Sequence, residues 1–147
     1  FKHEIGLWRD SFVPTIPDAG VDLRIGTDGA ASSGNGLNLL HEARLASLVQ
    51  RHDHWDSTLL PAKDIFGIAT KGSKDWVAWN LEDIRMRPLG RSNNRHLANL
   101  VYNGGDCLDV WVDGQALRLN GETKTVDERA TIEELDIAVS EYYDGIE

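Results

Sequence analysis

The sequence lacks several features that mark large classes of protein. It contains one cysteine, Cys107, so it cannot form an internal disulfide, and a disulfide-stapled secreted scaffold is excluded. The first residues show no basic region followed by an apolar core, which is the pattern of a signal peptide. No apolar run approaches the roughly 18 residues that a membrane-spanning helix needs. We therefore expect a soluble, cytoplasmic chain without a membrane segment.

Positive charge is also scarce. The chain has 15 Lys and Arg residues against 24 Asp and Glu residues, which gives a net charge of -9. This balance opposes binding to phosphate backbones and to anionic lipid surfaces. The glycines at positions 26, 29, 34 and 36 form neither a dinucleotide fingerprint nor a P-loop. We expect neither nucleic acid nor a membrane among the partners.

The main candidate for chemistry is Asp28, which follows a predicted strand. Val21, Leu23 and Ile25 alternate with polar residues, and this is the period of a β-strand. Small residues follow Asp28, and an apolar stripe over residues 37–51 predicts a helix. Such strand-to-helix junctions carry the functional residues of many α/β folds. The carboxylate of Asp28 could bind a divalent metal and accept a proton, or it could simply bond to nearby turn N–H groups.

The rest of the chain predicts further helices and a set of strands. The expected elements are a cap for the first helix at Asn35 or Asn38, a second helix whose start is signalled by Ser57 or Thr58 and Pro61 and which ends near Gly72, strands at 76–81 and 108–113, a short apolar segment at 97–102, turns at Asp113-Gly114 and Asn120-Gly121, and a final helix with its capping box at 131–134. His52 and His54 are expected in a polar loop. The apolar stripe of the final helix, formed by Ile132, Leu135, Val139 and Tyr142, is expected to dock on another surface.

Several segments, taken in order, resemble the C-terminal part of the amidohydrolase superfamily. They are residues 20–32 (GVDLRIGTDGAAS), 39–46 (LLHEARLA), 60–65 (LPAKDI), 68–70 (IAT) and 110–114 (VWVDG). The branch that they resemble holds atrazine-type chlorohydrolases and the S-adenosylhomocysteine, methylthioadenosine and 8-oxoguanine deaminases. The collinear order of the matches is more specific than any one of them.

The resemblance implies a fold and a reaction. It implies an α/β chain that forms the C-terminal portion of a TIM-type (β/α)8 barrel and part of a small β-sandwich. A complete barrel needs about 200 residues or more, so a chain of 147 residues can form only a portion of one. The implied divisions are residues 1–73 for the last barrel strand and outer helices, 74–128 for the sandwich segment and 129–147 for the C-terminal helix. The implied reaction is the hydrolytic removal of an amino group, or a halide, from an aromatic nitrogen heterocycle.

The resemblance also implies roles for single residues. Asp28 matches the aspartate that binds or faces the catalytic metal, which is zinc or alternatively iron, and that carries protons. Ala31 and Ser32 are expected to line the mouth of the substrate site. The other metal ligands of the family lie before the matched region, so we expect the chain to be inactive alone and to need the missing N-terminal barrel portion or a partner chain. A homo-oligomer is a further expectation.

Two alternatives stay open on the sequence alone. His52, His54 and Asp64 imitate the ligand set of JAMM-type metallopeptidases, although two histidines in a polar loop are more often surface residues. The chain could also be a catalytically inert fragment or a partner-binding module, whose apolar helix faces need a cover. Cys107 has no histidine and asparagine arranged around it, so we expect a packed thiol and not a nucleophile.

Overall fold

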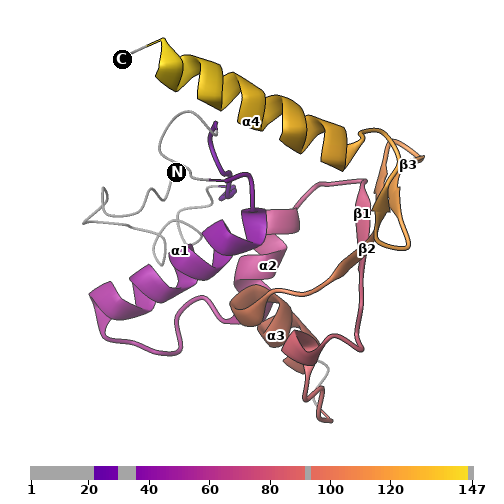
Figure 1. Ribbon diagram of the computed structural model, residues 1–147. Helices are drawn as coiled ribbons and strands as arrows, with labels where there is room; N and C mark the ends of the chain where they lie inside the picture. The colour runs from indigo at the N-terminus through magenta and orange to yellow at the C-terminus, as the bar shows by residue number, and fades with distance from the viewer. Residues whose placement is uncertain (1–21, 30–35, 92–93, 146–147) are drawn as a thin grey trace. The chain divides into compact units, whose positions relative to one another are not determined.

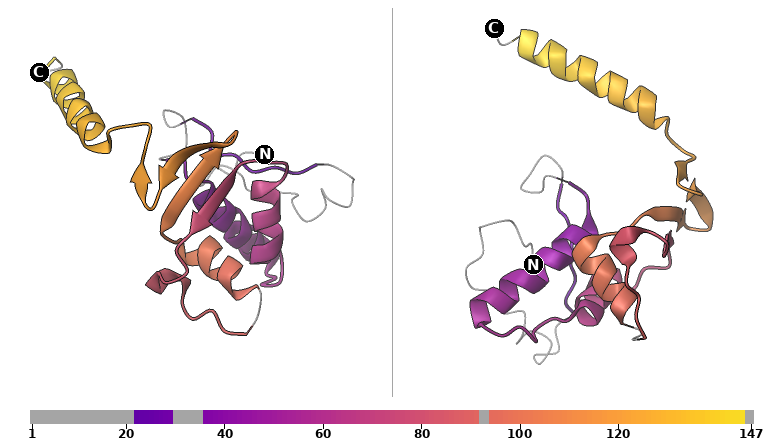
Figure 2. Two further views of the ribbon diagram at one scale, coloured as in Figure 1. Left: turned by 90° about the vertical axis from the view of Figure 1, so that its right-hand side faces the viewer. Right: turned by 60° about the horizontal axis from the view of Figure 1, so that its bottom comes forward.

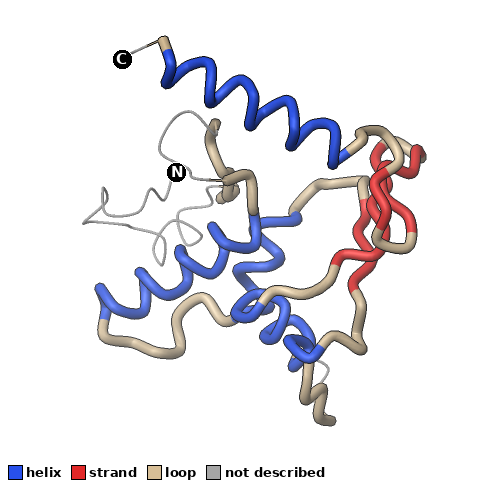
Figure 3. Tube along the Cα trace, viewed as in Figure 1, coloured by secondary structure: helices blue, strands red, loops and turns tan. Residues whose placement is uncertain are grey.

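The computed structural model describes residues 22–29, 36–91 and 94–145 and shows a mixture of helices and strands (Figures 1 and 3). In chain order the elements are α1 (Leu39–His54), α2 (Ala62–Thr70), β1 (Trp76–Trp79), the short 3-10 helix η2 (Ile84–Met86), α3 (Arg95–Asn103), β2 (Cys107–Val112), β3 (Gln115–Leu119), β4 (Glu122–Thr123) and α4 (Glu128–Asp144). The expected mixture of helix and sheet is confirmed. None of the described helices combines the length and the apolar character that crossing a bilayer requires.

The chain divides into two compact units. One, called here the helical unit, comprises Phe1–Ser73 and Leu81–Gly105, and the other, the sheet unit, comprises Lys74–Asn80 and Asp106–Glu147. Each unit is described by itself below.

The first helix of the helical unit begins where a side-chain cap satisfies its free N–H groups. The Asn38 Oδ1 atom accepts hydrogen bonds from the backbone N–H groups of Leu40 and His41, both at 3.1 Å, which confirms one of the two predicted caps. The helix ends at Trp55, which adopts a left-handed conformation with φ of 51°. It is about one turn longer than predicted, so His52 and His54 lie in its last turn and the prediction of a loop there was wrong. The His54 Nδ1 atom lies 3.1 Å from the Gln50 carbonyl oxygen, a contact to the preceding turn.

The core of the helical unit lies between α1, α2 and α3. Small alanines on α1 allow a close approach, and Ile65 of α2 is fully buried against them. The predicted helix after Pro61 is confirmed, with Pro61 at its N-cap position. The apolar segment at 97–102 is the centre of the helix α3, whose Leu100 and Val101 are buried. The buried amide of Asn99 donates from Nδ2 to the carbonyl oxygens of Met86 at 2.6 Å and Pro88 at 3.2 Å, and so joins α3 to η2.

Residues 22–29 do not form the strand that the alternating pattern predicts. A strand needs a neighbour with which to exchange backbone hydrogen bonds, and no described strand pairs with this segment. The segment nevertheless keeps the expected division of its faces. Ile25 packs against the helical core, whereas Asp22 and Arg24 are exposed.

The sheet unit contains a single antiparallel sheet in the strand order β1-β2-β3-β4 (Figure 2). Asp113 and Gly114 both have positive φ, 49° and 78°, which confirms the predicted turn between β2 and β3. Asn120 and Gly121, with φ of 50° and 82°, confirm the turn before β4. The indole rings of Trp76 and Trp111 stack across β1 and β2 with centroids 5.3 Å apart.

The final helix α4 is confirmed, but it begins three residues before the predicted capping box. Asp127 is the cap, and its Oδ1 atom accepts hydrogen bonds from the N–H groups of Arg129 and Ala130, both at 3.1 Å. Thr131 lies inside the first turn, where its hydroxyl bonds to the Asp127 carbonyl oxygen. No residue of α4 is buried in the described part of the chain.

Candidate functional site

Asp28 lies in the helical unit on the extended segment before α1. Its backbone is left-handed, with φ of 60°, a conformation that aspartate tolerates better than most residues. The Thr27 hydroxyl donates to the Asp28 carbonyl oxygen at 3.1 Å. Gly26 and Gly29 flank this pair, and a Cβ added to either would meet no atom within 4 Å. Asp28 is exposed. Asp28 therefore lies in an exposed stretch with open space around Gly26 and Gly29, and its expected role in metal binding stays a prediction.

A group of charged residues fixes the beginning of the same segment. The Arg24 guanidinium donates to Asp22 Oδ2, at 2.9 Å from Nη2 and 3.2 Å from Nε. Arg24 also donates to the carbonyl oxygen of Lys71, directly after α2, and the Lys71 ammonium group binds the other oxygen of Asp22. The Lys71 ammonium group, and after it the Arg24 guanidinium, lower the pKa of the Asp22 carboxyl group below its ordinary value of 3.8. Asp22 is thus held as a carboxylate at neutral pH.

The two other predicted site residues, Ala31 and Ser32, lie outside the described residues. Their expected role at the mouth of the substrate site stays a prediction.

The described residues do not form a complete metal site. A structural or catalytic zinc needs about three protein donors or more, and nowhere in residues 22–29, 36–91 and 94–145 do three His, Cys, Asp or Glu side chains come together. Asp28 fits one ligand position but cannot hold an ion alone. If the chain takes part in a zinc site, the other donors come from outside the described residues.

The same observation removes the support for a metallopeptidase site. His52 and His54 lie two positions apart on one helix, so their side chains leave it on different sides, and Asp64 lies in the first turn of α2. These three side chains are all described, and they are not brought together. His52, His54 and Asp64 therefore resemble the ligands of a JAMM-type metallopeptidase in their sequence spacing but not in their positions in the structure.

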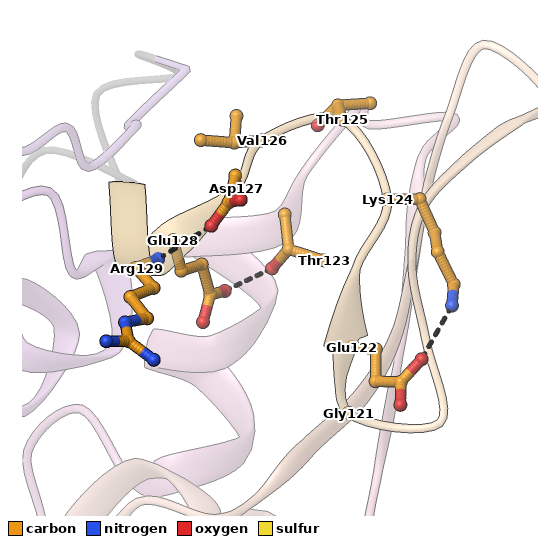
Figure 4. Close-up of a pocket in the computed structure, with 9 residues that line it drawn as sticks. All are labelled: Gly121, Glu122, Thr123, Lys124, Thr125, Val126, Asp127, Glu128 and Arg129. Carbon is orange, nitrogen blue, oxygen red and sulfur yellow. Dashed lines mark hydrogen bonds and ion pairs between the residues drawn. The ribbon is translucent and has the colours of Figure 1, made fainter. Parts of the chain in front are cut away.

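An open cleft of roughly 630 Å³ lies where the sheet unit passes from β4 into α4 (Figure 4). It is lined by residues 121–129, none of which was predicted as a site residue. Its polar groups bind one another: Glu128 accepts from Thr123 Oγ1 and lies 3.2 Å from Arg118 Nη1, and Lys124 pairs with Glu122 at 2.8 Å. The cleft has neither a histidine nor a cysteine among its lining residues. Its side chains serve to fix the start of α4.

Cys107 is a half-buried thiol in β2. Burial raises its pKa above the ordinary value of 9.0, so it is protonated at neutral pH. This supports the expected packed thiol and disfavours a nucleophile.

Comparisons with known proteins identify the kinship of this chain. No family model matches the sequence. The 5-methylthioadenosine/S-adenosylhomocysteine deaminases of Bacillus cytotoxicus and Bacillus cereus are each 33% identical to it over 136 residues, and each match covers 82% of this chain and 31% of the relative. A crystal structure of a zinc-bound adenosine deaminase from Xanthomonas campestris superposes with a TM-score of 0.71 and 27% identity, over 83% of this chain and 31% of that one. The chain thus spans about a third of the length of these proteins.

The matches show the family to which the chain belongs. They confirm that the chain belongs to the amidohydrolase superfamily and corresponds to the C-terminal part of its members. Within that superfamily it is related to the 5-methylthioadenosine/S-adenosylhomocysteine deaminases, which belong to the branch that the sequence motifs resemble.

Proposed function

We propose that this chain supplies the C-terminal share of a metal-dependent hydrolase that removes an amino group, or a halide, from an aromatic nitrogen heterocycle. The observation that carries the proposal is Asp28, an exposed carboxylate in a Gly-Thr-Asp-Gly turn, within a chain that is 33% identical to methylthioadenosine/S-adenosylhomocysteine deaminases. Removal of an amino group is favoured over removal of a halide because the relatives and the structural neighbour are named as deaminases.

Asp28 has the chemistry of a proton carrier. Its carboxylate accepts a proton from the attacking water and later returns one to the leaving group, so the residue is unchanged after each cycle. Zinc, with iron as the alternative, supplies Lewis acidity when bound, which lowers the pKa of water from about 15.7 toward about 7. The small side chains around Asp28 leave room for a planar ring to approach. Ala31 and Ser32, three and four positions further on, are proposed to contact that ring.

The finer fold belongs to the same proposal. Residues 22–29 take the place of the last barrel strand, α1 and α2 are outer helices, and the sheet of the sheet unit is part of a β-sandwich. Ile25 supports this arrangement because it packs on the helices as an outward-facing residue of a barrel strand does. The missing strand pairing of this segment is what a barrel strand shows without its neighbours.

The proposal includes a cover for the exposed apolar surface. The apolar stripe of α4 is exposed, with Leu135 exposed to 61%. We propose that the N-terminal barrel portion or a partner chain covers this stripe and also supplies the remaining metal ligands. A homo-oligomer and a cytoplasmic location are parts of the same proposal, and both rest on sequence composition and kinship. Because Asp28 is a single donor, the chain alone is expected to leave adenosine, methylthioadenosine and S-adenosylhomocysteine unchanged.

A chimera tests the proposal directly. The chain replaces the matching third of the Bacillus cereus deaminase, and ammonia release is measured with methylthioadenosine, S-adenosylhomocysteine and adenosine. We expect turnover by the chimera, and a loss of about 100-fold to 10,000-fold in kcat for Asp28→Asn, since that variant keeps the shape but not the proton acceptor. The zinc content of both proteins is measured, so that a lost ligand and a lost proton carrier are told apart.

Asp53→Asn is the matched control. It removes the same charge from an exposed aspartate in the last turn of α1, and it should leave turnover within about twofold. If the chimera folds and binds zinc but its turnover is the same before and after the Asp28→Asn substitution, the proposed role is contradicted. A folded, zinc-loaded chimera that turns over none of the three substrates would contradict the proposed substrate class.

A further inference from the structure

The turn that carries Asp28 has a glycine on each side. They are Gly26 and Gly29, and glycine loses more conformational freedom on ordering than any other residue. A carboxylate that moves protons at one defined point needs a fixed position. Some structure before the turn must therefore hold it. Ile25 gives one anchor, because its side chain packs on the core of α1 and α2.

A second anchor is formed by Asp22, Arg24, Lys71 and Gly72, called here the Arg24 clasp. Arg24 binds the Asp22 carboxylate and the Lys71 carbonyl oxygen at once, and the Lys71 ammonium group closes the ring onto Asp22. The clasp joins positions that are 47 residues apart in the sequence. It is thus a tertiary contact between the Asp28 segment and the end of α2.

The end of α2 is built to receive this cation. The last turn of α2 contains no basic residue, and the ammonium group of the C-cap residue Lys71 is bound to Asp22, so a further cation near the negative end of the helix dipole is favourable. Arg24 brings a guanidinium group to that end. Gly72, at φ of 79°, leaves the space for it, because a Cβ there would lie 3.0 Å from Arg24 Nη1.

We propose that Arg24 is a positioning residue for Asp28, and that the Arg24 clasp fixes the beginning of the segment so that the turn at Asp28 keeps one orientation. The catalytic part of this inference rests on the proposed function. The side chains of Arg24 and Asp22 are both 53% exposed, and exposed ion pairs add little to global stability. Losing the clasp should therefore change the order of the turn more than the stability of the fold.

The first test uses the full chain and needs no activity. Backbone nitrogen relaxation is measured for Thr27, Asp28 and Gly29 in the parent and in Arg24→Met, which keeps the length of the side chain but not its charge. We expect their order parameters to fall from about 0.85 toward 0.6 or below, with an unchanged unfolding midpoint. Gly72→Ala should act in the same direction, and Arg129→Met, on exposed α4, should change nothing in this turn. Unchanged order parameters in Arg24→Met would overturn the proposal.

The second test uses the chimera with the Bacillus cereus deaminase. We expect Arg24→Met to lower kcat about tenfold with KM within about twofold, and Arg24→Lys to recover part of the loss, because an ammonium group restores the charge but not the fork of donors. A residue with only a structural role would lower the yield of folded enzyme and not the turnover of each folded molecule. Loss of turnover in Asp28→Asn together with full turnover in Arg24→Met would refute the clasp alone. Full turnover in Asp28→Asn would instead refute the proposed function, and the relaxation measurement would still decide on the clasp.

Discussion

The helical unit and the sheet unit bury their apolar side chains to very different extents. Every side chain that is buried among the described residues belongs to the helical unit, including Ile65, Met86 and Leu100. The sheet unit has no buried residue in its described part, although it contains Trp76, Val77 and the apolar stripe of α4. Both units carry amphipathic patterns in the sequence, such as the apolar stripes at residues 37–51 and on the final helix.

The difference lies in how many layers each unit supplies for itself. In the helical unit α1, α2 and α3 face one another, and alanines at the contacts allow them to approach closely. The sheet unit has one sheet, and a sheet needs a second layer to bury its apolar face. An amphipathic pattern therefore indicates which face of a helix or strand is suited to burial. Whether that face is buried depends on a second layer of helices or strands that packs against it. The open surfaces of the sheet unit agree with the proposal that another part of an enzyme covers them.

The strongest test of this difference removes a matched side chain from each unit. Ile65→Ala deletes a side chain that is 1% exposed, and we expect the free energy of unfolding to fall by about 2–5 kcal/mol, because a cavity remains in a packed core. Ile132→Ala makes the same deletion on α4, where the side chain is 59% exposed, and the expected change is within about 0.5 kcal/mol.

Urea unfolding followed by circular dichroism measures both variants. If Ile132→Ala costs as much as Ile65→Ala, then α4 is covered in solution, and the contrast between the units fails for that helix. Repeating the pair at several protein concentrations separates a cover made by a second copy from one made within the chain, because only the former depends on concentration.

A second test concerns a buried polar contact within the helical unit. Asn99→Leu removes the amide that donates to the carbonyl oxygens of Met86 and Pro88. We expect a loss of about 1–3 kcal/mol, since these acceptors lose their donor in a buried place. Asn103→Leu is the control on the same helix, because its bond to the Arg85 carbonyl oxygen is exposed and 3.3 Å long. Equal losses of unfolding free energy in Asn99→Leu and Asn103→Leu would mean that burial of the hydrogen bond does not determine how much its removal destabilises the fold.

A third test asks whether the core of the helical unit is fully satisfied. The Ser47 hydroxyl bonds to the Leu60 carbonyl oxygen at 2.8 Å and to the Tyr102 hydroxyl at 2.9 Å. Both amide atoms of Gln50 are buried without a hydrogen-bond partner among the described residues. Ser47→Ala should destabilise by about 1 kcal/mol, whereas Gln50→Met should be neutral or stabilising, because it removes an uncompensated buried amide at nearly constant volume. Thermal unfolding of the two variants provides the comparison, and a large loss in Gln50→Met would show that the amide has a partner in solution.

The sequence predicted local features well where one residue type controls the backbone. The turns at Asp113-Gly114 and Asn120-Gly121 follow from the tolerance of asparagine, aspartate and glycine for positive φ, and the cap at Asn38 follows from its side-chain oxygen. The boundary errors at the end of α1 and the start of α4 were short. At the end of α1 the His54 ring contacts the Gln50 carbonyl oxygen, and at the start of α4 the Asp127 side chain accepts from the N–H group of Arg129. An apolar pattern carries no signal for either polar contact.

The sequence could not predict features that depend on distant parts of the chain. Within the described residues 22–25 the alternation gave the correct faces but not a strand, since strand formation requires a neighbour. The contact of Arg24 with Lys71 has no signal in spacing or period, because it joins two ends that only the packing of α2 brings together. The role of Asp28 stays a prediction from its motif, and the residues that would complete a metal site with it have no signal in the described part of the sequence.

The smallest expected effect compares two exposed carboxylates, one in each unit. The pKa of Asp22 is lowered by hydrogen bonds to Lys71 and Arg24, and the pKa of Glu122 is lowered by a hydrogen bond to Lys124, from ordinary values of 3.8 and 4.5. Since both values are lower in the folded chain, each contribution is present above the ordinary value and is lost as the pH falls through the lowered one. As the pH falls below 3.8 and through the lowered pKa, protonation of Asp22 should therefore weaken its contacts with the Lys71 ammonium group and with Arg24, whereas protonation of Glu122 should loosen only a contact two residues away. Amide chemical shifts of residues 70–73, followed from pH 6 to pH 2, should show a transition that Asp22→Asn abolishes and Glu122→Gln leaves intact, and a transition that survives in Asp22→Asn would mean that another group controls the end of α2.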